Sequence, residues 1–259
     1  METIVYRQLF PSFGALSAAE LIGSLPLVHD DPTVERPYTV VNFVASADGR
    51  TAIDGRSRGL SDPGDRELHR TLRERADAVL AGTGTIAADD YARMLPAAER
   101  RQRRLAAGRS AEPLAVIITR SGRLPLDVRL FAEPEARVLV FSPQQPAPSA
   151  ASAAAESTAQ LQHELLDPDT PRPLTAALST LKQRHQVSTL LCEGGPTLFS
   201  ALLREGLVDM LFLTIAPTLA GGPGPAVASG PPLEPPTQLQ LAGVLEREGS
   251  LFLRYALTR

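Results

Sequence analysis

Short apolar segments that alternate with helical patterns constrain the fold of this 259-residue chain more than any other feature. The segments LAVIIT, RVLVF and STLLC begin at residues 114, 137 and 188, and their aliphatic composition is typical of buried strands. Helical patterns flank the last of them, over residues 174–185 and 196–205. Strands that alternate with helices predict a mostly parallel sheet with helices on both faces.

The C-terminal part of the chain has a different pattern. Segments 239–244 and 251–256 alternate apolar with other residues, which predicts an antiparallel pair of strands. The expected fold class is therefore α/β, with a mixed, mostly parallel sheet, helices on both faces and this antiparallel pair at the end. Residues 37–259 are expected to form a single domain.

Two segments are expected to lie outside this regular alternation. Residues 1–36 are interpreted as an N-terminal extension with a short helix, capped by Ser17 with Glu20 three residues later. Their start, METIVYRQLF, lacks the apolar stretch behind a basic start that a signal peptide needs. Residues 143–160 are rich in Pro, Ala, Ser and Gln, and we interpret them as a mobile loop.

Composition limits the classes of partner. The formal net charge of -3 argues against a nucleic-acid binder, and no apolar run approaches the ~18 residues of a membrane span. The single cysteine, Cys192, excludes a disulfide within the chain, which suits a reducing, cytoplasmic compartment. Cys192 and four scattered histidines do not make a zinc pattern, so no metal is expected. A small molecule is the expected partner.

The motif EGGPTL, residues 193–198, follows the predicted strand STLLC directly. Its two glycines let a ligand approach the backbone, and Pro196 suits the first turn of a helix. Free N–H groups at Gly195, Thr197 and Leu198 would then face a phosphate group at the helix N-terminus. The glutamate would end its strand beside the crevice where α/β sheets bind ligands. A tight strand-to-helix turn with an exposed glutamate explains the same residues equally well.

A second glycine motif, GTGTIA at residues 82–87, follows a short apolar strand and partly matches a dinucleotide-binding fingerprint. No acidic residue ends the next strand to bind a ribose hydroxyl. Arg120, Ser121 and Arg123 follow that strand instead. Cationic and hydroxyl groups there suit a 2′-phosphate, which favours NADP over NAD. The alternative is that these arginines are ordinary solvated loop residues.

Three further features allow a functional and a structural interpretation. In ASADGRT, residues 45–51, small side chains would let a flat ring lie against the backbone, or Asp-Gly is a plain turn. Asp89 and Asp90 would form a paired-carboxylate acid–base site, or end a surface helix. Arg73 would bind an anionic substrate, or cover apolar surface with its stem.

In this order along the chain, the segments NFVASADGRTAIDG, GDRELHRTLRERADAVLAGTGTIAADDY, LAVIITRSGRLP and CEGGPTLFSALLREGLVDMLFLTIAPTLAGG resemble one family. It is the reductase domain of riboflavin biosynthesis, the C-terminal half of a bifunctional deaminase–reductase. The resemblance runs from about residue 38 to the end. It implies a dihydrofolate-reductase-like fold, a homodimer, and reduction of 5-amino-6-(5-phosphoribosylamino)uracil by NADPH.

The resemblance also implies roles for particular residues. Ser57, Arg73 and Glu193 match positions that hold the substrate, and Glu193 is the candidate catalytic residue, as a proton donor. Other positions match those that bind NADP in the family. They are Ala45, Thr85, Asp89, Ser121, Gly194, Gly195, Pro196, Thr197, Leu198, Phe199, Ser200 and Ala201.

The chain departs from the family pattern at the substrate end. Tyr91, Arg93 and Pro96 replace the usual Pro, Leu and Arg, and Gly59 stands where an aromatic residue often occurs. The deaminase signature, His-x-Glu with a later Pro-Cys-x-x-Cys, is absent. Two alternatives therefore stay open beside the pyrimidine reductase. One is a pterin reductase of the dihydrofolate type, and the other is a regulatory NADP-binding dimer without turnover.

Overall fold

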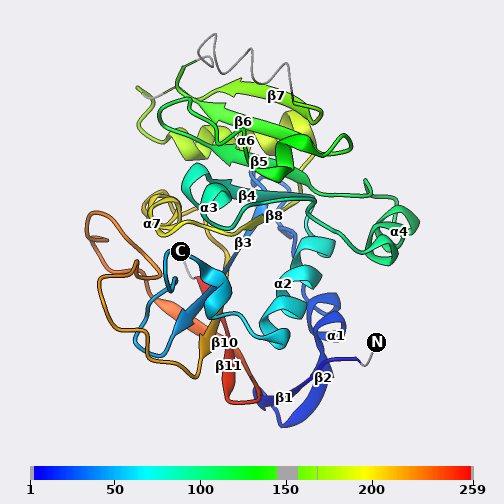
Figure 1. Ribbon diagram of the computed structural model, residues 1–259, viewed down its shortest axis with the longest axis vertical. Coiled ribbons are helices and arrows are strands. Elements are labelled where there is room, and N and C mark those ends of the chain that lie inside the picture. The colour runs from blue at the N-terminus through cyan, green and yellow to red at the C-terminus, as the bar shows by residue number, and fades with distance from the viewer. Residues whose placement is uncertain (1–2, 145–156, 168, 258–259) are drawn as a thin grey trace. The chain divides into compact units, whose positions relative to one another are not determined.

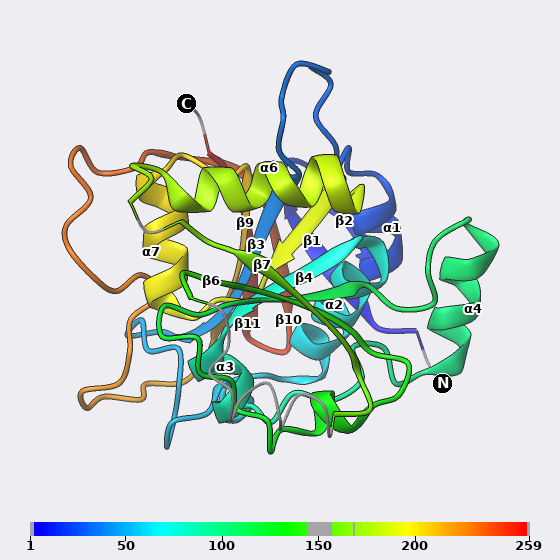
Figure 2. The same ribbon diagram turned by 90° about the horizontal axis from the view of Figure 1, so that it is seen from above.

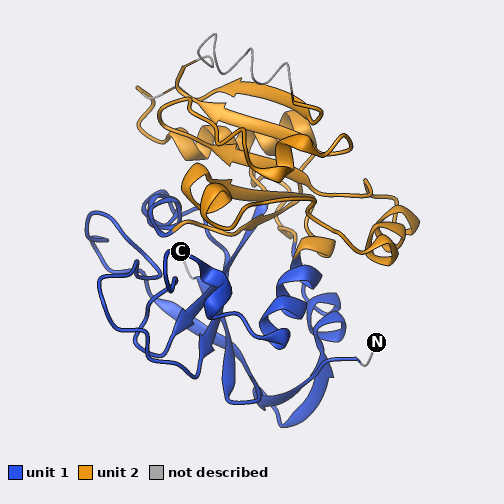
Figure 3. Cartoon of the chain, viewed as in Figure 1, with its two compact units in different colours: residues 1–27, 38–72, 196–259 blue, residues 28–37, 73–195 orange. Residues whose placement is uncertain are grey.

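The computed structural model describes residues 3–144, 157–167 and 169–257 (Figure 1). The chain divides into two compact units, which Figure 3 colours separately. The first unit comprises Met1–Leu27, Tyr38–Leu72 and Pro196–Arg259, and the second comprises Val28–Pro37 and Arg73–Gly195. Each unit therefore contains segments that are far apart in the sequence.

The described residues of the first unit form six strands in the order β2-β1-β10-β11-β9-β3. Their bounds are β1 Val5–Phe10, β2 Gly14–Ser17, β3 Tyr38–Ser46, β9 Met210–Ala216, β10 Leu239–Arg247 and β11 Ser250–Leu257. Strands β3 and β9 are parallel, and the other neighbours are antiparallel. The predicted C-terminal antiparallel pair is confirmed as β10 and β11.

Four helical elements begin in the first unit. They are α1 Ala18–Gly23, the 3-10 turn η1 Ser57–Gly59, α2 Pro63–Arg75, whose last residues belong to the second unit, and α7 Pro196–Arg204. Helix α1 starts with the predicted capping box: the Glu20 backbone N–H donates to Ser17 Oγ at 3.2 Å, and the Ser17 N–H donates to the Glu20 carboxylate at 2.7 Å. The start of this helix could be predicted from local sequence because both partners of the capping box lie within one turn.

Strands β1 and β2 are not anticipated by the sequence pattern, which showed no strand before residue 38. The side chain of Tyr6 is fully buried, while its neighbours along β1 are exposed or half-buried. Its hydroxyl donates to the Gly64 carbonyl at 2.7 Å, and its ring meets the Phe252 ring edge-on at 5.0 Å between centroids. One buried aromatic residue therefore attaches β1 to the core of the first unit.

We expect Tyr6→Ala to lower the free energy of unfolding by about 3–5 kcal/mol, the usual cost of deleting a buried aromatic ring. Tyr6→Phe should cost only about 1 kcal/mol, because it keeps the ring and removes the hydrogen bond to Gly64. Urea unfolding of both variants measures the two contributions. Equal stabilities of Tyr6→Ala and the unaltered chain would show that β1 does not contribute to the folded core.

The described residues of the second unit form five strands in the order β8-β4-β5-β6-β7, and all neighbours are parallel. Their bounds are β4 Ala78–Gly82, β5 Leu114–Ile118, β6 Arg137–Ser142, β7 Gln160–Leu165 and β8 Thr189–Cys192. The helical elements are α3 Thr83–Ala88, α4 Ala98–Ala106, the 3-10 turn η2 Arg129–Ala132 and α6 Pro173–His185. In Figure 2, α6 lies on one face of these strands and α3 on the other.

The predicted α/β class with a mixed sheet is confirmed, and the buried apolar segments became β4, β5, β6 and β8. Strand β7 was missed because its sequence, QLQHEL, is polar and half-exposed, as suits a strand at a sheet edge. It begins within the segment 143–160 that we interpreted as a mobile loop. Residues 145–156 of that segment lie outside the described residues. Among the described helices, none has the length and apolarity to cross a bilayer.

Candidate functional site

The carboxyl ends of the neighbouring strands β4 and β8 lie side by side in the second unit. Strand β4 ends at Gly82 and β8 ends just before Glu193. The Gly82 N–H donates to the Gly194 carbonyl at 2.8 Å, and the Glu193 N–H donates to the Leu80 carbonyl at 2.9 Å. The two glycine motifs, which sequence patterns identified separately, are therefore joined at the sheet edge where α/β proteins bind ligands.

Because Gly195 has no side chain, the two glycine motifs can approach each other closely. A Cβ atom on Gly195 would lie 2.9 Å from the Thr85 hydroxyl oxygen, closer than real contacts allow. Gly194 has a φ of 91°, which disfavours any other residue. The Thr85 hydroxyl therefore faces backbone without a side chain, an arrangement that suits a phosphate group held by N–H and O–H donors.

Glu193 forms a closed polar cluster with Arg73 and Tyr91. Arg73 donates from Nε and Nη2 to the two carboxylate oxygens, at 2.7 Å each. The Tyr91 hydroxyl donates to Oε2 of the same carboxylate, and the Arg73 guanidinium lies 5.2 Å from the Tyr91 ring centroid. The side chains of Arg73 and Glu193 are only 14% and 5% exposed. The fork of the arginine thus fixes both oxygens of a buried carboxylate.

The charges in this cluster stabilise one another. Burial alone would lower the pKa of Arg73, but the Glu193 carboxylate and Tyr91 together raise that pKa above its usual value. Burial and the charge of Glu193 hold the pKa of Tyr91 well above its usual range. Arg73 therefore stays charged and Tyr91 stays protonated at neutral pH. Three hydrogen bonds from Arg73 and Tyr91 therefore converge on the Glu193 carboxylate.

Arg73 and Glu193 were each predicted to contact substrate, and the structure shows that they also contact each other. Tyr91 was identified only as a departure from the family pattern, without a role. Its position directly after Asp89 and Asp90 was the available signal, but its burial against Glu193, 102 residues away, depends on the fold. The three residues form one functional candidate rather than separate ones.

The structure places the acidic pair Asp89 and Asp90 at the C-terminal end of helix α3. Asp89 ends helix α3, and its N–H donates to the Thr85 carbonyl at 3.0 Å, so these two residues are one turn apart as expected. Asp90 forms an exposed ion pair with Arg129, at 2.7 Å. This arrangement matches the helix-ending interpretation of Asp90.

The loop after β5 carries the predicted phosphate-binding groups Arg120, Ser121 and Arg123, all exposed. Ser121 Oγ accepts the Arg123 N–H at 3.3 Å. These groups follow the carboxyl end of β5, the neighbour of β4. They lie at the same edge of the second unit's sheet as the glycine motifs because the strands are parallel.

In the first unit, Ala45 is fully buried near the end of β3. The following Asp48 accepts hydrogen bonds from the Ser46 hydroxyl at 2.6 Å and from the N–H groups of Ala220 and Gly221 at 2.9 and 2.7 Å. These bonds, above all the one from Ser46, lower the pKa of Asp48. Asp48 therefore serves the turn, as the structural interpretation expected.

Helix α7 begins at Pro196, as predicted, and its residues divide by exposure. Thr197 is exposed, whereas Ser200 is buried and the Phe199 ring packs 5.4 Å from that of Phe43. Phe199 and Ser200 therefore contribute to the packing of the first unit. Ser57, the remaining substrate candidate, begins the turn η1.

No group of three or more side chains suited to a metal ion occurs within the part of the chain that the structure describes.

Comparison with known proteins places the chain in one family. The family model of the RibD C-terminal domain matches residues 37–252. The chain is 33% identical, over 201 residues, to a 2,5-diamino-6-ribosylamino-4(3H)-pyrimidinone 5′-phosphate reductase of Archaeoglobus fulgidus, covering 75% of this chain and 87% of that one. It is 32% identical over 195 residues to the riboflavin biosynthesis protein RibD of Mycobacterium tuberculosis, covering 74% of this chain but only 45% of that protein.

Solved structures agree with these sequence relatives. RibD of Acinetobacter baumannii matches with 28% identity and a TM-score of 0.68, covering 88% of this chain and 60% of that one. A pyrimidine reductase-like protein of Corynebacterium diphtheriae shares the fold, with a TM-score of 0.78 at 23% identity, covering 94% and 100%. The chain therefore belongs to the RibD C-terminal domain family, a family of reductases in riboflavin biosynthesis.

Proposed function

We propose that this chain transfers a hydride from NADPH to a ribosylaminopyrimidine 5′-phosphate, the class of substrate named for its Archaeoglobus relative. The observation that carries this proposal is the buried Glu193 carboxylate. Arg73 and Tyr91 hold it at the end of β8, beside the close approach of Gly195 to Thr85. A fixed carboxylate beside backbone that lacks a side chain suits a polar heterocycle and a dinucleotide together.

The residues at the ends of β4 and β8 fit NADPH. The Thr85 hydroxyl and the bare backbone at Gly195 suit its pyrophosphate, and the exposed Arg120 and Arg123 suit its 2′-phosphate. When bound, NADPH supplies the hydride. The protein holds donor and acceptor carbons close and aligned, and excludes water from them. The other predicted NADP-binding residues, Asp89 and Ser121 among them, stay part of this proposal.

Glu193 is proposed to accept hydrogen bonds from the amino or ring N–H groups of the pyrimidine. Arg73 and Tyr91 already donate to its two oxygens, which fixes the carboxylate plane before substrate arrives. Because these donors hold both of its oxygens, its proposed role is orientation of the substrate. The proton that completes the reduction then comes from solvent or from another donor.

A pterin without phosphate is the second candidate, and two observations favour it. The charge of Arg73 is neutralised by Glu193, so it does not offer the free cation that a substrate phosphate needs. Pro96 also stands where the family usually has an arginine. Both features weaken phosphate binding in comparison with the family pattern.

The substrate class is tested by following the loss of NADPH absorbance with three compounds side by side: the phosphorylated pyrimidine, its dephosphorylated form and dihydrofolate. We expect oxidation with 5-amino-6-(5-phosphoribosylamino)uracil, and a KM about 10- to 100-fold higher for the dephosphorylated compound, since a charge-assisted hydrogen bond contributes about 1.5–3 kcal/mol. Turnover of dihydrofolate alone would replace the proposal with a pterin reductase. NADPH binding without oxidation by any of the three would indicate a regulatory protein.

We further infer that the enzyme is a cytoplasmic homodimer with residues 37–259 as its reductase domain and residues 1–36 as an extension. The family resemblance supports the dimer. The single, buried Cys192 suits a reducing compartment. Light scattering during size-exclusion chromatography tests the dimer, and a monomeric mass would contradict it.

A further inference from the structure

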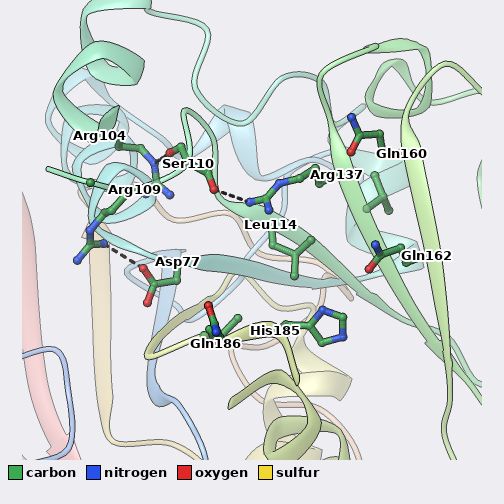
Figure 4. A pocket seen from close by; sticks show the side chains of 13 residues that line it. Asp77, Arg104, Arg109, Ser110, Leu114, Arg137, Gln160, Gln162, His185 and Gln186 are labelled. Atoms are coloured by element: carbon green, nitrogen blue, oxygen red, sulfur yellow. Dashed lines mark hydrogen bonds and ion pairs between the residues drawn. The ribbon is translucent and has the colours of Figure 1, made fainter. Parts of the chain in front are cut away.

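A polar cavity lies in the second unit, and Figure 4 shows the side chains that line it. It is at the opposite end of the parallel strands from Glu193, which follows the carboxyl end of β8. Its volume is ≈ 410 Å³, large enough for a small metabolite. Its lining includes Asp77, Leu114 and Arg137, which stand at or just before the starts of β4, β5 and β6. Since these strands are parallel, their starts share one sheet edge and their carboxyl ends share the other.

Positive charge dominates this cavity. Arg104, Arg109 and Arg137 line it, and Asp77 is the one carboxylate among its lining residues, so the formal charge is three minus one, or +2. The carboxylate of Asp77 already has partners within the protein. Its Oδ1 lies 3.3 Å from Arg109, and its Oδ2 accepts the N–H groups of Ser188 and Thr189, both at 2.9 Å. The other lining residues therefore do not balance this positive charge.

Two of the three arginines, Arg104 and Arg109, also stabilise the fold. The buried Arg104 donates to the carbonyls of Ser110, at 2.8 Å, Glu74, at 2.8 Å, and Ala76, at 2.5 Å. Burial, followed by the charges of Arg109 and Arg137, lowers the pKa of Arg104 to about 10. Arg104 is thus repelled by two neighbouring guanidinium groups, in a site where an anion would relieve the repulsion.

Arg137 has no comparable structural role. It is exposed at the start of β6 and donates one hydrogen bond, at 3.0 Å, to the Ser110 hydroxyl. Among the residues that the structure describes, no carboxylate pairs with it. A stabilising role for the fold explains Arg104, and partly Arg109, but it does not explain why Arg137 lines the same cavity.

The remaining lining suits the uncharged part of a polar ligand. Gln160 and Gln162 project from the same face of β7, because successive side chains of a strand alternate between faces. Gln186 follows α6, and Leu114 and Val187 supply apolar surface. Side-chain amides and aliphatic groups together can contact the hydroxyls and ring of a sugar or a base.

We propose that this cavity binds a small phosphorylated metabolite, with its phosphate between Arg109 and Arg137 and its polar body against the glutamines of β7. The charge of +2 matches a phosphate dianion. The volume exceeds that of inorganic phosphate and matches a sugar phosphate. This site is separate from the proposed hydride-transfer site and does not depend on its chemistry.

The test is calorimetric titration of the full chain with ribose 5-phosphate, with ribose and inorganic phosphate as comparison ligands. We expect ribose 5-phosphate to bind more tightly than either. Arg137→Gln should weaken binding by about tenfold or more, the effect of losing one charge-assisted contact. Gln162→Glu should weaken it as well, and Gln162→Lys should strengthen it, because the first adds repulsion and the second adds attraction to the phosphate.

Arg7→Gln is the matched control, because Arg7 is also an exposed arginine but lies on β1 in the first unit. It should bind ribose 5-phosphate as the unaltered chain does, and thermal unfolding should show that all four variants are folded. Binding that is absent, or that does not change in Arg137→Gln and Gln162→Glu, would overturn the proposal. Equal affinity for inorganic phosphate would contradict an organic ligand. These tests measure binding alone, so their outcome does not depend on whether the chain oxidises NADPH.

Discussion

Gly195→Ala is expected to weaken NADPH binding by at least ~100-fold, about 2.7 kcal/mol, while the chain stays folded. The new Cβ would lie 2.9 Å from the Thr85 hydroxyl oxygen, so either this hydroxyl turns away or the turn at residue 195 moves. Both changes disturb the Thr85 hydroxyl and the Gly195 backbone, which we assign to the pyrophosphate. The cost to stability should be only about 1–3 kcal/mol, as for other overpacked sites. Calorimetric titration with NADPH measures the binding, and urea unfolding measures the stability.

The chain offers a matched control in Gly84→Ala. Gly84 lies in the same segment as Thr85, but a Cβ there would have no atom within 4 Å. It sits within α3, where alanine favours the helix by up to about 1 kcal/mol over glycine. Gly84→Ala should therefore bind NADPH normally and be slightly more stable. If Gly195→Ala and Gly84→Ala bound NADPH with similar affinity, the proposed position of the pyrophosphate at the end of β8 would be wrong.

A double variant separates the steric effect from the loss of a ligand contact. Thr85→Ala removes the hydroxyl that Gly195→Ala would meet, so the double variant should recover most of the stability that Gly195→Ala loses. It should not recover NADPH binding, because the Thr85 hydroxyl is itself a proposed contact. Stability that stays low in the double variant would show that the alanine Cβ meets some other obstacle.

Replacement of the Glu193 side chain should be strongly destabilising. Glu193→Leu leaves the Arg73 guanidinium, 14% exposed, without its carboxylate, and breaking a buried ion pair in this way costs about 3–5 kcal/mol. Reductase activity should fall below detection, because the group proposed to orient the pyrimidine is lost. Urea unfolding and the NADPH absorbance assay give the two results independently.

The double variant Arg73→Met, Glu193→Leu should be more stable than Glu193→Leu alone, because it leaves no unpaired charge. Tyr91→Phe should cost about 1–2 kcal/mol, since it removes one hydrogen bond to the carboxylate and keeps the ring beside Arg73. If Tyr91→Phe raises KM with little change in kcat, Tyr91 positions Glu193 for substrate binding. A Glu193→Leu variant as stable as the unaltered chain would contradict the closed cluster.

Much of the fold was predictable because its signals are local. Strands β5, β6 and β8 are short aliphatic segments, and such segments become buried wherever parallel strands pack between helices. The start of α1 was predictable for the same reason, since Ser17 and Glu20 bond within one turn. The polar strand β7 and the strand β1 lack such a pattern. The position of β7 depends on its pairing with a neighbouring strand, and that of β1 depends on the buried Tyr6.

The family, the α/β class and the two glycine motifs could be predicted from the amino-acid sequence, because consecutive residues encode each of them. What these residues contact was set by the fold. It paired Arg73 with Glu193 across 120 positions, placed Tyr91 on the same carboxylate, and set Gly195 against Thr85. It also gathered Arg104, Arg109 and Arg137 around one cavity. Contacts of this kind depend on the order and direction of strands, which no local pattern encodes.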